Sequence, residues 1–396
     1  MSTAGLQQKP AGVLWPSLLQ FIFSGFALTL IWGLAFFSLL GNLFVSRSQP
    51  GDVFAQDWFA SVGFLTLGLL LLPSTILSLR KILGHTSREI NIPGGRFGLS
   101  ILLIPVALLA GDWLLSKQES GWTAPLHIFV ALLSVGWILW VALHNLKPGS
   151  GQRAWGALGS GLAITPLLAF VFEIIGAIIF FLILGIYIGT NPELTHALTS
   201  ISDLTNQLNP NMELVLERLE PLFNDPFVLI LAIAGLGIFV PLVEELFKPI
   251  GVMLLLGRNL TAAQGFALGA ICGAGYALVE NLTVGANADT WALTSIGRFG
   301  TSAMHILTTA LSGYALVRAK SEKRYLALLG TYLLNVVIHG TWNSLVVLSS
   351  AMALTSFGAE PPPGMLYIGP ALLAGLALIC ILGLSRYNRR LSESRQ

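Results

Sequence analysis

The feature that most constrains this chain is a series of long apolar segments separated by short polar ones. We identify ten, centred near residues 31, 68, 106, 134, 173, 241, 274, 307, 338 and 376. A helix that crosses a bilayer needs about 20 mostly apolar residues, and each segment is long enough. None shows the apolar–polar alternation typical of barrel strands. The sequence therefore predicts an all-α, polytopic membrane helix bundle with about ten transmembrane helices.

Composition supports this class of protein. Hydrophobic residues make up 54% of the chain and charged residues 10%, whereas a soluble domain carries about 25% charged residues. Mean hydropathy is +0.77. A net charge of +2 gives no reason to expect a nucleic-acid partner, so the bilayer itself is the expected environment. Cys272 and Cys380 both lie in apolar segments, which excludes a disulfide framework and a cysteine-based metal site.

The placement of Lys and Arg predicts the orientation of the bundle. In a ten-helix arrangement, 16 of the 21 basic residues fall on one side of the membrane, in the N-terminus, alternate loops and the C-terminal tail. Basic loops are retained in the cytoplasm. We therefore expect both termini to be cytoplasmic. The first apolar run, from about Ser17 to Val45, is too long for the hydrophobic region of a cleavable signal peptide.

The longest polar connection divides the chain. We expect an N-terminal membrane domain of five helices over residues 1–190, an external amphipathic connection over 191–225, and a C-terminal membrane domain of five helices over 226–396. Within the connection, apolar residues repeat at helical spacing, namely Leu194, Leu198, Ile201, Leu204 and Leu208, then Leu216, Leu219 and Phe223. Such segments lie at a membrane interface. They either pack on the helix ends or act as a lid that gates a substrate.

The sixth helix carries the first ionisable cluster, formed by Glu244, Glu245 and Lys248. Buried charges in a bilayer are costly unless they are paired, so a cluster indicates a functional site. Adjacent side chains diverge by about 100° around a helix, which keeps the two carboxylates from facing one point. Lys248 is within reach of either, and we expect it to neutralise one of them. A structural ion pair with one extra acid is the simpler alternative.

The next three helices carry polar stripes. In the seventh helix, Gly265, Gly269, Gly273, Tyr276 and Glu280 fall on one face. Small residues allow another helix to approach closely, so this face either delivers Glu280 into the interior or is a packing stripe that ends in a hydrated acid. The eighth helix aligns Ser302, His305, Thr309 and Ser312, and the ninth aligns Asn335, His339 and Asn343, with Trp342 alongside.

These helices supply one set of candidate catalytic residues. The set is Glu244, Glu245, Glu280, His305 and His339, supported by Lys248, Tyr276 and Asn343. Two histidines and a carboxylate suffice to hold a catalytic Zn²⁺, with Glu280, His305 and His339 as the ligands and another Glu as general base. The same residues could act without metal, with Glu activating water and His stabilising the oxyanion. A proton-linked transporter would use the same residue types.

The order of these motifs resembles one family. Glu244-Glu245-x-x-Lys248, Tyr276-x-x-x-Glu280, the His305 helix and His339-x-x-x-Asn343 are similar to the motifs of the PrsW intramembrane proteases, relatives of the CAAX-prenyl proteases and of the γ-secretase scaffold subunit. The resemblance covers roughly residues 226 to 350, with Tyr276 where the family has Phe. It implies an integral protein of a bacterial plasma membrane that cleaves a membrane-anchored protein such as an anti-sigma factor.

Two other functions compete with proteolysis. A non-catalytic scaffold like the γ-secretase subunit would have little reason to keep the costly Glu pair, and a transporter is expected to show an inverted repeat, which we do not detect. The isolated polar residues have simpler explanations. Glu173 is expected to pair with a hydroxyl or a lysine, and Asp112 and His127 are expected to be solvated near helix ends. The oligomeric state is not predicted.

Overall fold

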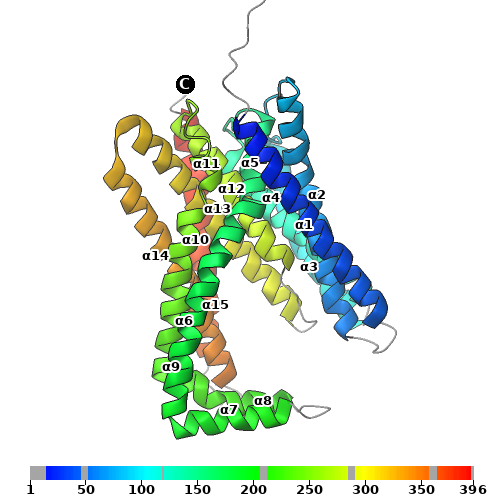
Figure 1. The fold of residues 1–396 in the computed structure, drawn as a ribbon, viewed down its shortest axis with the longest axis vertical. Helices are drawn as coiled ribbons and strands as arrows, with labels where there is room; N and C mark the ends of the chain where they lie inside the picture. Colours follow the sequence, from blue (N-terminus) through cyan, green and yellow to red (C-terminus); the bar gives the residue numbers. More distant parts are fainter. Residues whose placement is uncertain are drawn as a thin grey trace, which may run out of the picture.

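The computed structural model describes residues 15–45, 52–117, 120–205, 212–283, 290–355 and 364–393. Within these ranges the regular structure is helical, apart from one antiparallel bridge between Glu89 and Ser150. The predicted all-α class is therefore confirmed. Figure 1 shows long helices that run side by side, with a pair of shorter helices lying across one end.

The N-terminal part of the bundle supplies helices that face outward and helices that join the core. They are α1 (Trp15–Val45), α2 (Asp52–Ile82), η1 (Gly95–Leu102), α3 (Leu103–Ser116), α4 (Ser120–Leu143), α5 (Gly151–Gly159), η2 (Ser160–Ile164) and α6 (Thr165–Thr190). Large apolar side chains on α1 and α6 are exposed, as expected of helices that face lipid.

The remaining helices include those that carry the polar motifs. They are α7 (Pro192–Thr205), α8 (Met212–Asn224), α9 (Pro226–Ala232), η3 (Ile233–Phe239), α10 (Val240–Phe247), α11 (Ile250–Met253), α12 (Ala262–Thr283), α13 (Trp291–Glu322), α14 (Tyr325–Thr355) and α15 (Met365–Glu393).

Nine helical segments in the described part of the chain have the length and hydropathy of a membrane span. The expected tenth, centred near residue 307, is α13. This helix has 32 residues and is long enough to cross, but it is too polar to meet the hydropathy of a span. The polar residues in its middle, from Ser302 to Ser312, are enclosed by other helices, so they do not meet lipid. A polytopic helical bundle is thus what the sequence predicts and what the structure contains.

Two of the long spans are interrupted by π-helical turns. η2 joins α5 to α6, and η3 joins α9 to α10. Each turn lies directly before a proline near the start of the next helix, Pro166 and Pro241. Proline lacks an N–H and crowds the carbonyl one turn before it, so a regular helix is disrupted there. Such π turns are frequent at functional sites, and η3 immediately precedes the Glu pair.

The core is centred on α12. In its most apolar window, 83% of the residues are buried, far more than in the outer spans. It packs against α13 on one side and against α4, α5 and α2 on the other. The glycine stripe of α12 explains the contact with α13, because a Cβ at Gly273 would lie 2.6 Å from the His305 carbonyl oxygen. The expected close helix approach is therefore present.

The connection at the division of the chain contains the two helices α7 and α8, which lie across the end of the bundle (Figure 1). Ile188, Leu194 and Leu222 form a small buried cluster beneath them. Asp225 caps α9 by accepting from the N–H groups of Phe227 and Val228. Leu208, which belongs to the expected apolar repeat, lies outside the described residues. The division into two membrane domains stays a prediction.

Candidate active site

Helix α10 buries two adjacent carboxylates and a lysine near the middle of the bundle. Glu244, Glu245 and Lys248 are 5%, 1% and 0% exposed. The Lys248 Nζ lies 3.0 Å from Glu244 Oε2 and 2.7 Å from Glu245 Oε1. The expectation that Lys248 neutralises a single carboxylate is therefore wrong. The Lys248 side chain is long enough to place its ammonium between Glu244 and Glu245, which lie four and three residues before it.

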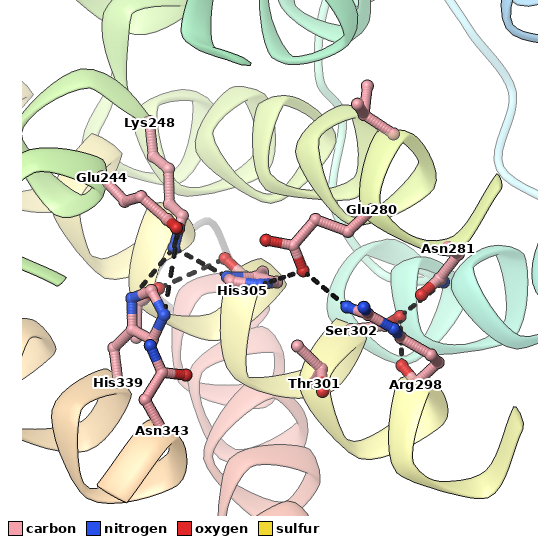
Figure 2. Close-up of polar contacts among 12 residues, drawn as sticks. Glu244, Lys248, Glu280, Asn281, Arg298, Thr301, Ser302, His305, His339 and Asn343 are labelled. Carbon is pink, nitrogen blue, oxygen red and sulfur yellow. Dashed lines mark hydrogen bonds and ion pairs between the residues drawn. The ribbon is translucent and has the colours of Figure 1, made fainter. Parts of the chain in front are cut away.

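The ammonium of Lys248 also joins the two histidines. Nζ lies 2.7 Å from His305 Nδ1 and 3.2 Å from His339 Nδ1 (Figure 2). An ammonium donates three hydrogen bonds, and three contacts have hydrogen-bond geometry, namely those to Glu245 and to the two imidazoles. The contact with Glu244 Oε2 is an ion pair without that geometry. His305 then accepts at Nδ1 and carries its proton on Nε2. His339 Nδ1 lies 3.2 Å from the ammonium and 3.0 Å from Glu245 Oε1, so it accepts from Lys248 in one tautomer and donates to Glu245 in the other.

Glu280 and Arg298 lie on the far side of His305. His305 Nε2 donates to Glu280 Oε2 at 2.9 Å, and Arg298 Nη1 donates to the same oxygen at 3.1 Å (Figure 2). Tyr276 packs edge-on against the His305 ring, with 5.2 Å between centroids, and lies beneath the Lys248 ammonium. These contacts fix the orientation of the His305 imidazole from three directions.

Arg298 was not predicted from the sequence. It lies two helical turns before His305 on α13, so the spacing of seven residues places it on the same helix face. This spacing is the sequence signal from which Arg298 could have been predicted. Thr308 is a second residue of the site that was not predicted, and its Oγ1 donates to Glu245 Oε1 at 3.2 Å. Thr308 is next to Thr309, which belongs to the polar stripe predicted for this helix.

Asn343 is held by the π turn that precedes α10. Its Nδ2 donates to the Leu236 carbonyl at 2.9 Å. In a π turn this carbonyl would bond to the N–H five residues on, but residue 241 is proline and has none. The N–H of Val240 bonds to Gly235 instead. Pro241 thus leaves the Leu236 carbonyl free to accept from Asn343, and this hydrogen bond connects α14 to η3.

The adjacent carboxylates of α10 border different cavities. Glu244 lines a cavity of about 410 Å³ together with Glu280, His305, His339 and Asn343. Glu245 lines a separate, mostly apolar cavity of about 260 Å³ between α10, α13 and α14. The roughly 100° between neighbouring helix positions accounts for this separation. Of the two acids, only Glu244 is placed in the cavity that holds both histidines.

The polar residues outside this cluster differ from expectation in two places. His127 is 4% exposed rather than solvated, and its Nε2 donates to the Asn281 carbonyl at 2.8 Å. Glu173 keeps one buried oxygen, Oε1, without a hydrogen-bond partner among the described residues, so the expected hydroxyl or lysine does not pair with that atom. The free Cys272 is buried and donates to the Lys248 carbonyl at 3.0 Å.

One group of three residues in the described part of the chain could hold a metal ion. Glu244, His305 and His339 each offer a ligand atom within 4.8 Å of the others. Two imidazole nitrogens and a carboxylate form a suitable donor set for zinc. Glu280, which we expected as a ligand, lies behind His305 and outside this group. The Lys248 ammonium lies among the same donors, so an ion has to displace it.

Comparison with known proteins gives one match. The model of the PrsW family intramembrane metalloproteases matches residues 194–374, which contain α10, α12, α13 and α14. No curated protein and no solved structure matches the chain.

Proposed function

We propose, from the match of residues 194–374 to the model of the PrsW family intramembrane metalloproteases, that the chain hydrolyses a peptide bond of a membrane-anchored protein in the cavity beside Glu244. The observation that carries the proposal is this cavity of about 410 Å³, where two histidines, two carboxylates and an amide meet between apolar helices. Peptide hydrolysis needs a base for water and donors for the developing oxyanion. An anti-sigma factor is the substrate class that the family resemblance implies.

Glu244 is the proposed general base. Its carboxylate borders the cavity, and its Oε2 contacts Lys248 as an ion pair and makes no directed hydrogen bond. A water molecule in the cavity can therefore give its proton to this carboxylate. Glu245 lies deeper, where it holds Lys248, His339 and Thr308. We assign it a positioning role, so that both acids are required for different reasons.

His339 and Asn343 are the proposed oxyanion donors. The Nε2–H of His305 is already used by Glu280, whereas Nε2 of His339 has no such partner and lies 3.9 Å from Glu244 Oε2. His339 Nε2 is a donor in the tautomer whose Nδ1 accepts from Lys248. Asn343 gives one N–H to Leu236, and its amide has a second. Glu280 then orients His305 through Nε2, in the way that carboxylates orient imidazole ligands of metals.

The donor set fits a zinc ion, and Glu244, His305 and His339 would hold it; as ligands, Glu244 and His339 would then give up the roles of base and oxyanion donor that they have without the ion. When bound, the ion would supply a Lewis acid that lowers the pKa of water. We propose that activity falls with a chelator and returns with Zn²⁺. Activity that is unchanged by the chelator would assign the role of the site's cation to Lys248 and would remove only the metal from the proposal.

The decisive test is cleavage of a single-span substrate by purified variants. Glu244→Gln and Glu245→Gln should each lower the rate by about 10²- to 10⁴-fold, the usual loss when a general base fails. Glu322→Gln makes the same change on the exposed end of α13 and should leave the rate unchanged. Near wild-type rates from both cavity variants would reduce the Glu pair to a structural ion cluster, as a scaffold or a transporter could also contain.

We also propose that both termini face the cytoplasm of a bacterial cell. The start of α1 and the end of α15 lie at the same end of the bundle (Figure 1), where the basic loops gather. A reporter fused after Gln396 should behave as cytoplasmic, and one inserted near Asn206 as external. The reverse result at either position would invert the orientation.

A further inference from the structure

A third cavity, of about 310 Å³, lies at the end of the bundle where α1 begins and α2 ends. We call it the basic pocket. Its walls come from α1, α2, α5, η2 and the segment after α11, and it shares no lining residue with the cavity beside Glu244. The proposed function does not use it.

Three cations line the basic pocket, namely Lys81, Arg153 and Arg258. All three side chains are partly exposed. None forms an ion pair or a side-chain hydrogen bond with another residue that the structure describes, and none of the described lining residues is acidic. Three like charges around one cavity repel one another unless an anion lies between them, so the charge arrangement favours an anionic ligand.

Part of the wall of the basic pocket is apolar. Leu19 and Phe23 of α1 and Leu254 after α11 line it, and they are 43%, 49% and 57% exposed. Four polar side chains of the lining are already engaged with one another. Gln20 donates to Ser74, and Gln152 donates to Ser17 at 2.8 Å. A ligand that fits therefore presents an anionic head and an apolar chain.

We propose that the basic pocket binds an anionic phospholipid, with the phosphate among Lys81, Arg153 and Arg258 and an acyl chain along the α1 wall. Basic pockets between membrane helices on the cytoplasmic side bind lipid headgroups in this way. A zwitterionic lipid brings its own cation and gains less from the three charges. A soluble phosphate gains nothing from the apolar wall.

The segment that the lipid touches also carries catalytic candidates. Gly251 lines the basic pocket, and it follows Lys248 by three residues. A Cβ at Gly251 would lie 3.1 Å from Ser160 Cβ, so α11 is already packed against η2 at this point. Bound lipid would therefore hold the C-terminal end of the segment that contains Glu244 and Glu245.

Native mass spectrometry of the full chain in detergent tests the proposal. Dioleoylphosphatidylglycerol should bind at least tenfold more tightly than dioleoylphosphatidylcholine. Lys81→Gln, Arg153→Gln and Arg258→Gln should each weaken binding of the anionic lipid about fivefold, and the triple variant on the order of 100-fold. Binding of the zwitterionic lipid should not change.

Arg80→Gln is the matched control, because Arg80 is the exposed neighbour of Lys81 on α2 and does not line the pocket. An equal loss from Arg80→Gln would show that surface charge alone attracts the lipid and would overturn the proposal. So would equal affinity for the two lipids, or binding of glycerol 3-phosphate as tight as that of the intact lipid. The melting temperature of each variant in lipid-free detergent establishes that it is folded.

Discussion

Helices α13 and α6 belong to the same bundle but differ in polarity and in exposure. α13 is lined with Ser302, His305, Thr308, Thr309 and Ser312, all of them 4% exposed or less. α6 is apolar and largely exposed, and its single acid, Glu173, has a buried oxygen without a partner. The difference shows that enclosure by other helices, more than hydropathy, determines where a polar residue is tolerated. A helix that is surrounded by protein can carry chemistry that a lipid-facing helix cannot.

The largest expected effect comes from removing the cation of the enclosed cluster. Lys248→Met leaves Glu244 and Glu245 buried without their ion-pair partner. Breaking a buried pair in this way costs about 3–5 kcal/mol. We expect the lowest melting temperature of any single variant and no cleavage activity.

The double variant Lys248→Met/Glu245→Gln checks the cause of that loss. It removes one of the two unpaired charges and should recover part of the stability without recovering activity. Equal melting temperatures for the single and double variants would mean that lost packing of the lysine stem, and not unpaired charge, destabilises the protein.

A smaller effect is expected from a methyl group between α12 and α13. Gly273→Ala places a Cβ 2.6 Å from the His305 carbonyl oxygen, and overpacking of this kind costs about 1–3 kcal/mol. Because α13 must shift, cleavage should fall together with the melting temperature.

The lipid-facing helix supplies the control for this substitution. A Cβ at Gly185 on α6 would meet nothing within 4 Å, so Gly185→Ala should leave both quantities unchanged or raise the stability slightly. Equal losses at the two positions would mean that the contact between α12 and α13 is not the tighter one.

Glu173→Gln should have a modest effect of the opposite sign. An unpartnered carboxylate oxygen is costly to bury, and a neutral amide is less so. We expect a slightly higher melting temperature. Glu173 interacts electrostatically with Glu244 and Glu280 across the site, so we expect less than a tenfold change in cleavage rate. A loss as large as that of Glu244→Gln would place Glu173 in the catalytic machinery.

The smallest effect is expected at the exposed end of α13. Arg318 and Glu322 form a close ion pair there, with the carboxylate 42% exposed. Exposed pairs contribute little, because water and salt screen them. Arg318→Gln should leave the melting temperature and the cleavage rate unchanged. A clear loss of stability would mean that this pair is part of an interface in the folded protein.

Helical spacing predicted which side chains share a face, and therefore most of the cluster. It placed Glu280 after the glycine stripe, and His305 and His339 on successive helices. It could not predict distances between helices. The contacts of Lys248 with both acids and both imidazoles depend on where α13 and α14 lie around α10. The arrangement of the helices also determines that Glu244, and not Glu280, joins the two histidines in the group that could hold a metal ion.

Two further features depend on backbone geometry that periodicity does not report. The π turn at η3 changes the direction in which later side chains point, and only the position of Pro241 hinted at it. Arg298 on α13 reaches Glu280 on α12, which lies 18 residues before it in the chain. His127 was expected to be solvated because it lies near a helix end, but α12 covers it and accepts its hydrogen bond.

The π turn before Pro241 also determines what a single-residue deletion would do to this protein. A π turn holds about one residue more than the α-helical turn that it replaces. Removing one residue from Ile233–Phe239 would therefore be absorbed by a return to α-helical winding, and Glu244 and Glu245 would keep their directions. The same deletion in a regular stretch of the helix would rotate everything after it by about 100°, which is the angle between the two acids. The π turn is thus the place in this span where the chain can lose one residue without exchanging the base for its neighbour.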